Sequence, residues 1–398
     1  MSTDDELYVD STEATRMLGV SLQTLYAYVS RKQLRSERIK GSRSRKYWRA
    51  DVERLAGSVS EQVFPASPAA LVSETKITLL TAGGMYFRGH DAIALSQHAT
   101  LESLAALLWQ VEEASVFSDP PVDASDVWHQ LRPSLSELSA PERMIAMFPM
   151  IERANVRSYE LSPQSYARTG ADVLRWCATL LVKAPKPSTQ PLHLFVSKAL
   201  KTEPGFDDVI RRLLVLAADH EFDPITFAVR TVANVGVTAY QAVTTGLIAS
   251  QGQRFQAERY GSAMRFLHEI LASKNGRMAV VRRLRSGESM PGFSEHTHDP
   301  RTIALMDSLE RSLRGSRELR RIREAECTVK EASGASMEFI VPALFVGHHL
   351  GLHGDELSIA ALGRMVGWIA HAMEQFHGSP LIRPRASYVG PLPTDASS

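Results

Sequence analysis

Several arginines near the end of the chain stand in irregular contexts rich in glycine, proline and aromatic residues. Arg301 ends the segment Gly-Phe-Ser-Glu-His-Thr-His-Asp-Pro-Arg, Arg364 begins Arg-Met-Val-Gly-Trp-Ile-Ala-His, and Arg383 and Arg385 share Arg-Pro-Arg-Ala-Ser-Tyr-Val-Gly. A guanidinium presents a fixed fork of donors that matches a carboxylate. If these arginines converge, they form a pocket for a small polyacid.

A histidine is the second candidate for ligand contact. His220 lies in Ala-Asp-His-Glu, residues 218–221, after an apolar helical segment and shortly before Pro224, which is suited to begin another helix. Connections between helices often carry the side chains that meet a ligand. By itself, however, a lone histidine is more often a structural residue.

Composition is that of an ordinary globular protein. The 398 residues carry a net charge of +1, with 44% hydrophobic and 22% charged residues, and this length allows two or three domains. No apolar run approaches the roughly 18 residues that span a bilayer, and the acidic start does not predict a signal peptide. Cys177 and Cys327 predict neither a disulfide framework nor a metal site, and we expect a cytoplasmic protein.

Residues 1–57 are expected to form a small basic module. Ser11 and Ser21 are suited to cap two short helices, over 12–18 and from 22, that Gly19-Val20 separates; residues 34–48 suit a β wing and 51–55 a closing helix. Between residues 31 and 54 there are ten Lys or Arg and three acids. The stretch resembles the excisionase and MerR-type winged helix-turn-helix family, through Ala-x-x-x-Leu-Gly-Val-Ser at 14–21 and Thr-Leu-Tyr at 24–26.

That resemblance implies DNA binding, with a protein-interaction module as the alternative. Gln23, Thr24 and Tyr28 would face the groove, while Arg43, Arg45 and Lys46 would meet phosphates. A single module of this size binds weakly, so a dimer would be needed. Residues 58–72, which contain Pro65 and Pro68, are expected to be a linker.

The rest of the chain predicts a mainly α body that starts with a short hairpin. Residues 76–80 and 85–89 are expected to form two strands joined by a glycine turn. Thr100 is suited to cap the first of many helices. Breaks are expected at Pro120-Pro121, at 185–187 and around Gly287. Apolar residues recur at helical spacing over 140–155, 169–183, 191–201, 207–218, 225–235, 238–250, 257–272 and in the segment that begins at 358.

Five segments together resemble the citrate synthase family, in order and across about residues 75–391. They are Tyr-Phe-Arg-Gly at 86–89, Ala-Asp-His-Glu at 218–221, Asp-Pro-Arg at 299–301, Arg-x-x-Gly-Trp-Ile-Ala-His at 364–371 and Arg-Pro-Arg-x-x-Tyr-x-Gly from 383. The resemblance implies a helical homodimer whose large domain, 73–218 and 328–398, and small domain, 219–327, close over oxaloacetate and acetyl-CoA. It implies no bound cofactor and no metal, with acyl-CoA as a possible co-substrate.

The substrate anchors that the family uses are all present. The resemblance assigns oxaloacetate binding to His220, Arg301 and Arg364, and to Arg383 reached from a partner subunit. Arg385 is expected to be structural. A dianion in a closed site requires several paired donors, so the reasoning from the arginines and the resemblance agree.

The catalytic positions depart from the family pattern. Phe255 stands where the family's Gly-Pro-Leu-His-Gly-Gly loop has histidine, and phenylalanine donates no hydrogen bond. Glu295 replaces the histidine of Gly-Phe-Gly-His, although His296 could substitute for it. Glu338 replaces the aspartate base; its extra methylene moves the carboxylate by about 1 Å, a misplacement that can cost roughly 100-fold.

These replacements predict a protein that binds an oxaloacetate- or citrate-like polyacid with weak or no turnover. Together with the basic module, they suggest a metabolite-responsive DNA-binding regulator. One alternative is an active citrate or 2-methylcitrate synthase that uses Glu338 as base and His296 as electrophile. Another is a non-catalytic subunit paired with an active paralogue. The histidines at 348, 349 and 353, near Asp355, are expected to lie in a solvated loop.

Overall fold

The structure is a computed structural model, and it describes most of the helical body. The described residues are 8–30, 34–38, 45–49, 51–52, 55, 74–81, 83–295, 299–379 and 381–382, with the side chains of 255–257 also outside the description. The linker expected at 58–72 therefore lies outside the described residues, whereas residues 51, 52 and 55 of the expected closing helix are described as helical.

The N-terminal part has a hydrophobic core of its own. Strands β1 (Tyr8–Val9), β3 (Arg45–Trp48) and β2 (Ser36–Arg38) form an antiparallel sheet in that order, beside helices α2 (Ser11–Leu18) and α3 (Leu22–Ser30). Gly19 closes α2 in the left-handed region, at φ 63°. Asp10, rather than the expected Ser11, caps α2, because its carboxylate accepts from the amide of Glu13. Six buried residues form the core: Val9, Ala14, Leu25, Leu34, Tyr47 and Val52.

The body begins with a three-stranded antiparallel sheet and continues as helices. The strands β4 (Thr78–Thr81), β5 (Gly84–Phe87) and β6 (His90–Asp91) pair in that order. The helices that follow are α5 (Ala92–His98), α6 (Leu101–Trp109), α7 (Glu113–Phe117), α8 (Ser125–Leu131), α9 (Ala140–Ala154), α10 (Pro163–Leu181), α11 (Leu192–Leu200), α12 (Phe206–Leu216), α13 (Pro224–Ala233) and α14 (Ala239–Ser250), with a 3-10 turn at Val156–Tyr159.

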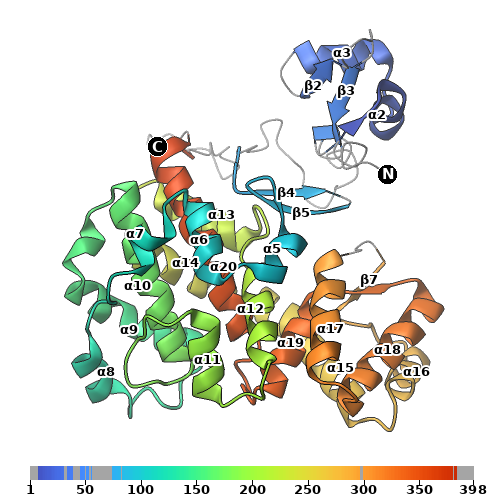
Figure 1. Ribbon diagram of the computed structural model, residues 1–398. Helices are drawn as coiled ribbons and strands as arrows, with labels where there is room; N and C mark the ends of the chain where they lie inside the picture. Colours follow the sequence, from blue (N-terminus) through green and yellow to red (C-terminus); the bar gives the residue numbers. More distant parts are fainter. Residues whose placement is uncertain are drawn as a thin grey trace, which may run out of the picture.

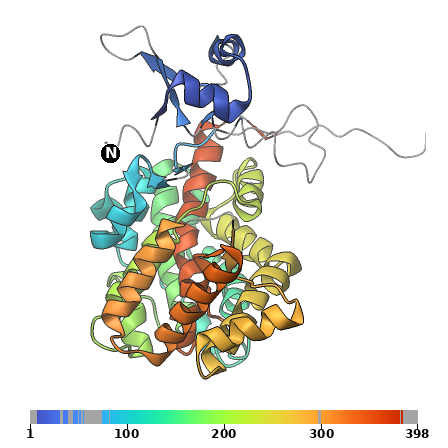
Figure 2. The same cartoon turned by 90° about the vertical axis from the view of Figure 1, so that its right-hand side faces the viewer.

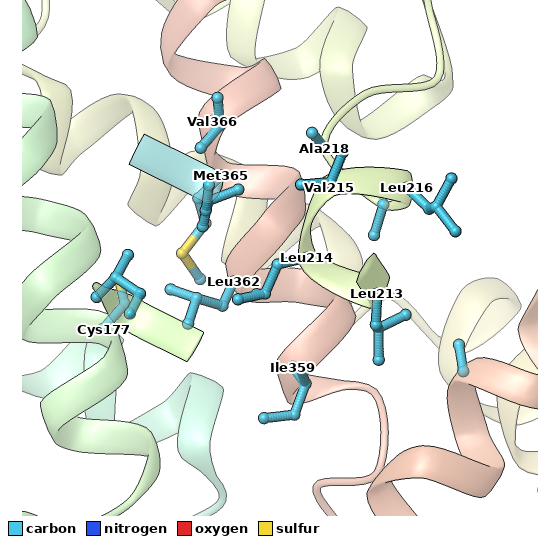
Figure 3. Packing of buried hydrophobic residues seen from close by; sticks show 14 of the residues in the cluster. Cys177, Leu213, Leu214, Val215, Leu216, Ala218, Ile359, Leu362, Met365 and Val366 are labelled. Carbon is cyan, nitrogen blue, oxygen red and sulfur yellow. The ribbon is translucent and has the colours of Figure 1, made fainter. Parts of the chain in front are cut away.

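Helix α20 (Ser358–Gly378) runs through the middle of this body (Figures 1 and 2). It packs against α6, α10, α12, α13 and α14. Its buried side chains include Ile359, Leu362, Met365 and Val366, and Leu362 lies beside Leu214 of α12 (Figure 3). A helix that is buried this extensively organises its neighbours through packing rather than through its own propensity.

Two glycines let α20 approach the end of α12 closely. A Cβ on Gly363 would lie 2.4 Å from the carbonyl oxygen of Leu214, and one on Gly367 would lie 2.4 Å from the carbonyl oxygen of Ala218. The amide of Gly367 donates to that Ala218 oxygen at 3.1 Å. No side chain other than hydrogen fits at this crossing, which brings the residues after α12 next to α20.

A second group of helices lies beside the first. The helices α15 (Gly261–Ala272), α16 (Gly276–Ser286) and α18 (Arg317–Ser333) pack on one another, and α17 (Pro300–Ser312) packs on α12, α5 and α19 (Ile340–His349). Strands β7 (Phe293–Ser294) and β8 (Ser336–Met337) pair antiparallel. Helices α13 and α14 pack against α20, and α14 also contacts α9 and α10; the division at residue 219 stays a prediction.

The periodic segments up to α14 were predicted well. The expected ranges 140–155, 191–201, 207–218 and 238–250 match α9, α11, α12 and α14, and Thr100 caps α6 through a capping box. The hairpin and the three expected breaks are also confirmed, with Gly287 ending α16 at φ 67°. The sequence reading missed α5, α7, α8 and most helices after α15.

The close crossing of α20 and α12 predicts the effect of a single methyl group. Gly367→Ala places a Cβ 2.4 Å from the Ala218 oxygen and 2.5 Å from an oxygen of the Asp219 carboxylate, so α20 must move. We expect a loss of about 1–3 kcal/mol in unfolding free energy, measured by urea denaturation followed by circular dichroism.

Gly378→Ala is the matched control at the end of the same helix. A Cβ there meets nothing within 4 Å, so stability should be unchanged or slightly raised. Equal stability of the Gly367→Ala variant and the wild type would contradict the close approach.

Candidate active site

One cavity of about 720 Å³ brings together three of the four predicted anchors and the predicted base. Such a volume is typical of a small-molecule site. His220, Arg301, Arg364 and Glu338 all line it, and they come from the α12–α13 connection, α17, α20 and the end of β8. Further lining residues include Ser139, Glu142, Asp223, Leu247, Ser250, Gln251, Arg259, Tyr260, Met264, Asp299, Phe339, Asp355, Ser358 and Trp368.

Arg301 is held rigidly at the start of α17. Its Nε and Nη2 donate to the Asp299 carboxylate at 3.0 Å and 2.7 Å, and its Nη1 donates to the carbonyl oxygen of Leu216 at 3.3 Å. The guanidinium lies over the ring of Phe339, 4.5 Å from its centroid. Pairing and stacking together fix the orientation of this buried side chain.

Arg364 is anchored by residues at the start of α13. Its Nη2 donates to Asp223 Oδ2 at 2.7 Å and to Thr226 Oγ1 at 2.8 Å. Asp223 also caps α13, accepting from the amide of Thr226 at 2.7 Å. The arginine Nη1 lies 3.2 Å from Asp219 Oδ1, close enough for an ion pair, but the angle does not give a hydrogen bond.

Asp219 is a fully buried carboxylate that joins three parts of the fold. Its Oδ2 accepts from Thr78 Oγ1 of β4 at 2.5 Å and from the Glu221 amide at 3.1 Å, and it lies 3.2 Å from His371 Nε2 of α20. Although burial opposes its ionisation, the hydrogen bonds from His371 and Thr78 and the positive charge of Arg364 hold the pKa of Asp219 well below its usual range. The buried group is therefore an anion that its partners stabilise.

A chain of side chains leads from Asp219 toward the start of β4. Arginine only donates hydrogen bonds, so the 3.1 Å contact between Arg230 Nη1 and His371 Nδ1 makes Nδ1 the acceptor and leaves the hydrogen on Nε2, facing Asp219. Arg230 also donates to Glu374 Oε2 at 2.7 Å. The other oxygen of Glu374 accepts from the backbone amide of Lys76 at 2.8 Å.

His220 sits in a strained connection and faces the pocket. The next residue, Glu221, has a φ of 56°, a left-handed conformation that is costly outside glycine and often marks a functional site. The imidazole is exposed to solvent through the cavity, and the protein atoms around it nevertheless reduce its contact with water. Burial first, and then the charges of Arg301 and Arg364, lower the pKa of His220 to about 4. The imidazole is consequently neutral near pH 7.

Glu338 is placed by the short ladder between β7 and β8. Phe293 pairs with Met337, and the Glu338 amide donates to the carbonyl oxygen of Gly292 at 2.9 Å. Gly292 adopts φ 86°, and a Cβ there would lie 2.6 Å from Val341. This turn fixes the backbone from which Glu338 reaches the cavity.

The remaining expected catalytic and anchoring residues are either outside the cavity or outside the described residues. Glu295 is exposed and outside the lining. His296, Arg383 and Arg385 lie outside the described residues, and so does the side chain of Phe255. Their assignments stay predictions.

The sequence reading missed several residues that the structure places around the anchors. Asp219 and Asp223 pair with Arg364, and Asp219 stood in the same Asp-His motif that was used to find His220. Asp223 precedes a proline, a common signal for a helix cap that could have drawn attention to it. Nothing in the sequence indicated Tyr260 or Gln251, which also line the cavity.

The residues expected to meet DNA lie in different environments. Gln23 is exposed, while Thr24 bonds to the Ser21 hydroxyl at 2.9 Å and Tyr28 packs against the core of the N-terminal part. Arg45 donates to Ser36 Oγ at 2.8 Å, and Lys46 lies 3.8 Å from Glu37. Arg43 lies outside the described residues.

Neither a metal-binding cluster nor a membrane-spanning helix occurs among the described residues. Within the described part of the chain, no group of three or more His, Cys, Asp or Glu side chains is arranged to hold a metal ion. None of the helices there combines the length and apolar character that a membrane span requires.

Curated relatives share about a quarter of their residues with this chain. It is 24% identical over 349 residues to citrate synthase 2 of Bacillus subtilis, covering 76% of this chain and 89% of that protein. It is 26% identical over 355 residues to 2-methylcitrate synthase of Mycobacterium tuberculosis, covering 76% of this chain and 84% of that one.

Solved citrate synthases share the fold. The structure from Pyrobaculum aerophilum superposes with a TM-score of 0.67 at 17% identity, covering 83% of this chain and 95% of its own. A ternary complex of the Thermoplasma acidophilum enzyme with carboxymethyl coenzyme A and oxaloacetate superposes with a TM-score of 0.62 at 20% identity. This match covers 86% of this chain and 98% of that one.

The family described as citrate synthase, C-terminal domain, matches residues 69–385, well over half of the chain. With the ordered motifs and the shared helical fold, this match shows that the chain belongs to the citrate synthase family.

Proposed function

We propose that this protein is a citrate synthase-type acyltransferase, which joins the acyl group of an acyl-CoA to oxaloacetate. The observation that carries the proposal is the convergence of His220, Arg301, Arg364 and Glu338 on one cavity. Relatives named citrate synthase and 2-methylcitrate synthase support it, with acetyl-CoA or propionyl-CoA as the acyl donor. This is the active alternative drawn from the sequence, and the comparisons favour it over the loss of catalysis.

The lining favours a ligand that is rich in acceptors. Arg364 Nη1, Gln251 Nε2 and Trp368 Nε1 are buried N–H donors that lack an acceptor among the described residues. Buried donors without partners are costly. A carboxylate or carbonyl in the cavity, with small adjustments of these side chains, would satisfy them.

The balance of charge around the anchors supports a role for a further positively charged side chain. Arg301 is matched by Asp299, and Arg364 is matched by both Asp219 and Asp223. A dianion needs additional positive charge to bind tightly. In the family resemblance that charge comes from a second subunit, so we propose a homodimer in which Arg383 of the partner subunit completes the site.

The chemistry assigned to Glu338 is proton removal from the carbon next to the thioester carbonyl. The resulting enolate carbon attacks the ketone carbon of oxaloacetate and forms the new carbon–carbon bond, and water then cleaves the thioester to release CoA. A half-buried carboxylate within the cavity is suited to act as the base. The longer side chain of glutamate, compared with the family's aspartate, predicts a lower rate.

Glu338→Gln tests the proposal because it removes the base and keeps the size of the side chain. With oxaloacetate and acetyl-CoA or propionyl-CoA, release of the CoA thiol should fall at least about 100-fold in kcat. Oxaloacetate affinity by calorimetry should change by less than about threefold, since Arg301 and Arg364 remain.

Glu160→Gln, an exposed glutamate outside the cavity, is the matched control and should behave as wild type. If the wild-type dimer binds oxaloacetate without releasing CoA, the acyltransferase proposal is wrong and the binding regulator, or a subunit that needs an active paralogue, takes its place.

The low pKa of His220 predicts that dicarboxylate binding takes up a proton. A bound dianion offsets the charges of Arg301 and Arg364, so the pKa of His220 rises from about 4. Because the complex then binds more protons than the free protein, the affinity for the dicarboxylate should increase as pH falls from 6.5 toward 4.

Calorimetry at pH 5.5 in buffers of different ionisation enthalpy measures this uptake. We expect a fraction of a proton per site for wild type and for His90→Gln, an exposed control, and a clearly smaller uptake for His220→Gln. Equal uptake in both histidine variants would refute the assignment to His220.

For the N-terminal part we propose DNA contact. Support comes from the exposed Gln23 on α3, a helix without acidic residues in its first turn, and from the basic strand β3 at its side. Fluorescence anisotropy with a labelled duplex should show binding whose salt dependence weakens in the double variant Arg45→Ala/Lys46→Ala. The slope of log affinity against log salt should fall by about 1 for each lost phosphate contact.

Lys183→Ala/Lys186→Ala, which removes two positive charges from the helical body, controls for net charge. Binding that is equally weakened by both double variants, or absent in the wild type at low salt, would favour the protein-interaction alternative.

A further inference from the structure

The segment that replaces the family's histidine loop has an unusual backbone. Residues Arg254–Tyr260 form a π-helix that leads directly into α15, and they follow Gly252 at the end of α14. π-helical turns are rare and occur frequently at functional sites. Their wider spacing rotates the residues that follow, so the side chain that reaches the site need not be the one at the position expected from the sequence.

Tyr260, the last residue of this turn, lines the same cavity as Arg364 and Glu338. Its side chain is half-buried, and the charges of Asp223 and Arg364 act on its hydroxyl. Burial raises the pKa of Tyr260 above the ordinary value of 10. The phenol therefore keeps its proton throughout the range in which an enzyme would work, and it can donate a hydrogen bond.

We propose that the Tyr260 hydroxyl supplies the hydrogen bond that the missing histidine would have given to the thioester oxygen. This inference rests on the proposed acyltransferase function. When Glu338 takes the proton from the acyl carbon, the electron pair moves onto the thioester oxygen, and Tyr260 donates a hydrogen bond to it without transferring its proton. The electrons return as the new carbon–carbon bond forms, so the phenol ends the step unchanged.

Two other donors in the lining are less suited to this role. Arg259 is exposed, so water weakens its interaction with a developing charge. Gln251 lies at the C-terminal end of α14, and its buried amide Nε2 must move before it can reach a ligand. Tyr260 combines access to the cavity with partial burial, the setting in which a hydrogen bond to an oxyanion is strong.

Tyr260→Phe removes only the hydroxyl and keeps the ring. Removing one such donor costs about 10²–10³ in kcat, so CoA release should fall by that factor while oxaloacetate affinity stays within about threefold of wild type. Carboxymethyl-CoA carries an oxyanion at the end of its acyl-like arm; its affinity in the presence of oxaloacetate should fall at least about tenfold. Tyr159→Phe, an exposed tyrosine outside the cavity, is the matched control and should change neither quantity.

The outcomes separate this inference from the function on which it rests. An active wild type with an equally active Tyr260→Phe variant overturns the role of Tyr260 and leaves the acyltransferase intact. A variant that loses oxaloacetate affinity and kcat together, by equal factors, makes Tyr260 an anchor for the dicarboxylate and also overturns the inference. A wild type that binds oxaloacetate but releases no CoA overturns the proposed function and the inference with it.

Discussion

The structure depends on a buried carboxylate at the point where α12, β4 and α20 meet. Asp219 has no exposed surface, yet it is an anion, because Arg364, His371 and Thr78 surround it. Removing one partner of a buried ion pair leaves an uncompensated charge, at a cost of about 3–5 kcal/mol. The ligand-facing arginine therefore also stabilises the fold, and its orientation is fixed before any ligand arrives.

The same constraint explains the glycines of α20. Gly363 and Gly367 lie one turn apart on the face that meets the end of α12, and neither has room for a Cβ. Between them Arg364 projects toward Asp219 and Asp223. In the motif Arg-x-x-Gly-Trp, Arg364 is the ligand anchor and Gly367 allows the backbone of α20 to approach α12. The arginine reaches Asp219 because the glycine permits this approach.

Much of the helical body could be predicted from periodicity, because α9, α12 and α14 bury one apolar face. The helices after α15 were harder to predict from hydrophobic periodicity. Helix α18 carries Arg, Lys or Glu at nine of its 17 positions and buries only Leu319, Ile322, Ala325 and Val329, so its apolar signal is sparse. The anchors His220, Arg301 and Arg364 were found through short motifs that local sequence preserves. Tyr260 was not found from the sequence, because its position depends on a π-helix. No local sequence pattern distinguishes that turn from the start of an α-helix.

The chain of contacts from Arg364 through Asp219, His371 and Arg230 to Glu374 ends on the backbone amide of Lys76. Lys76 lies near the point where the described helical body begins, after the segment that joins it to the N-terminal part. A ligand that alters the pairing of Asp219 also alters the energy of this attachment, and thermodynamic linkage makes the effect reciprocal. Occupancy of the cavity and the attachment of Lys76 to α20 are, to that extent, one coupled equilibrium.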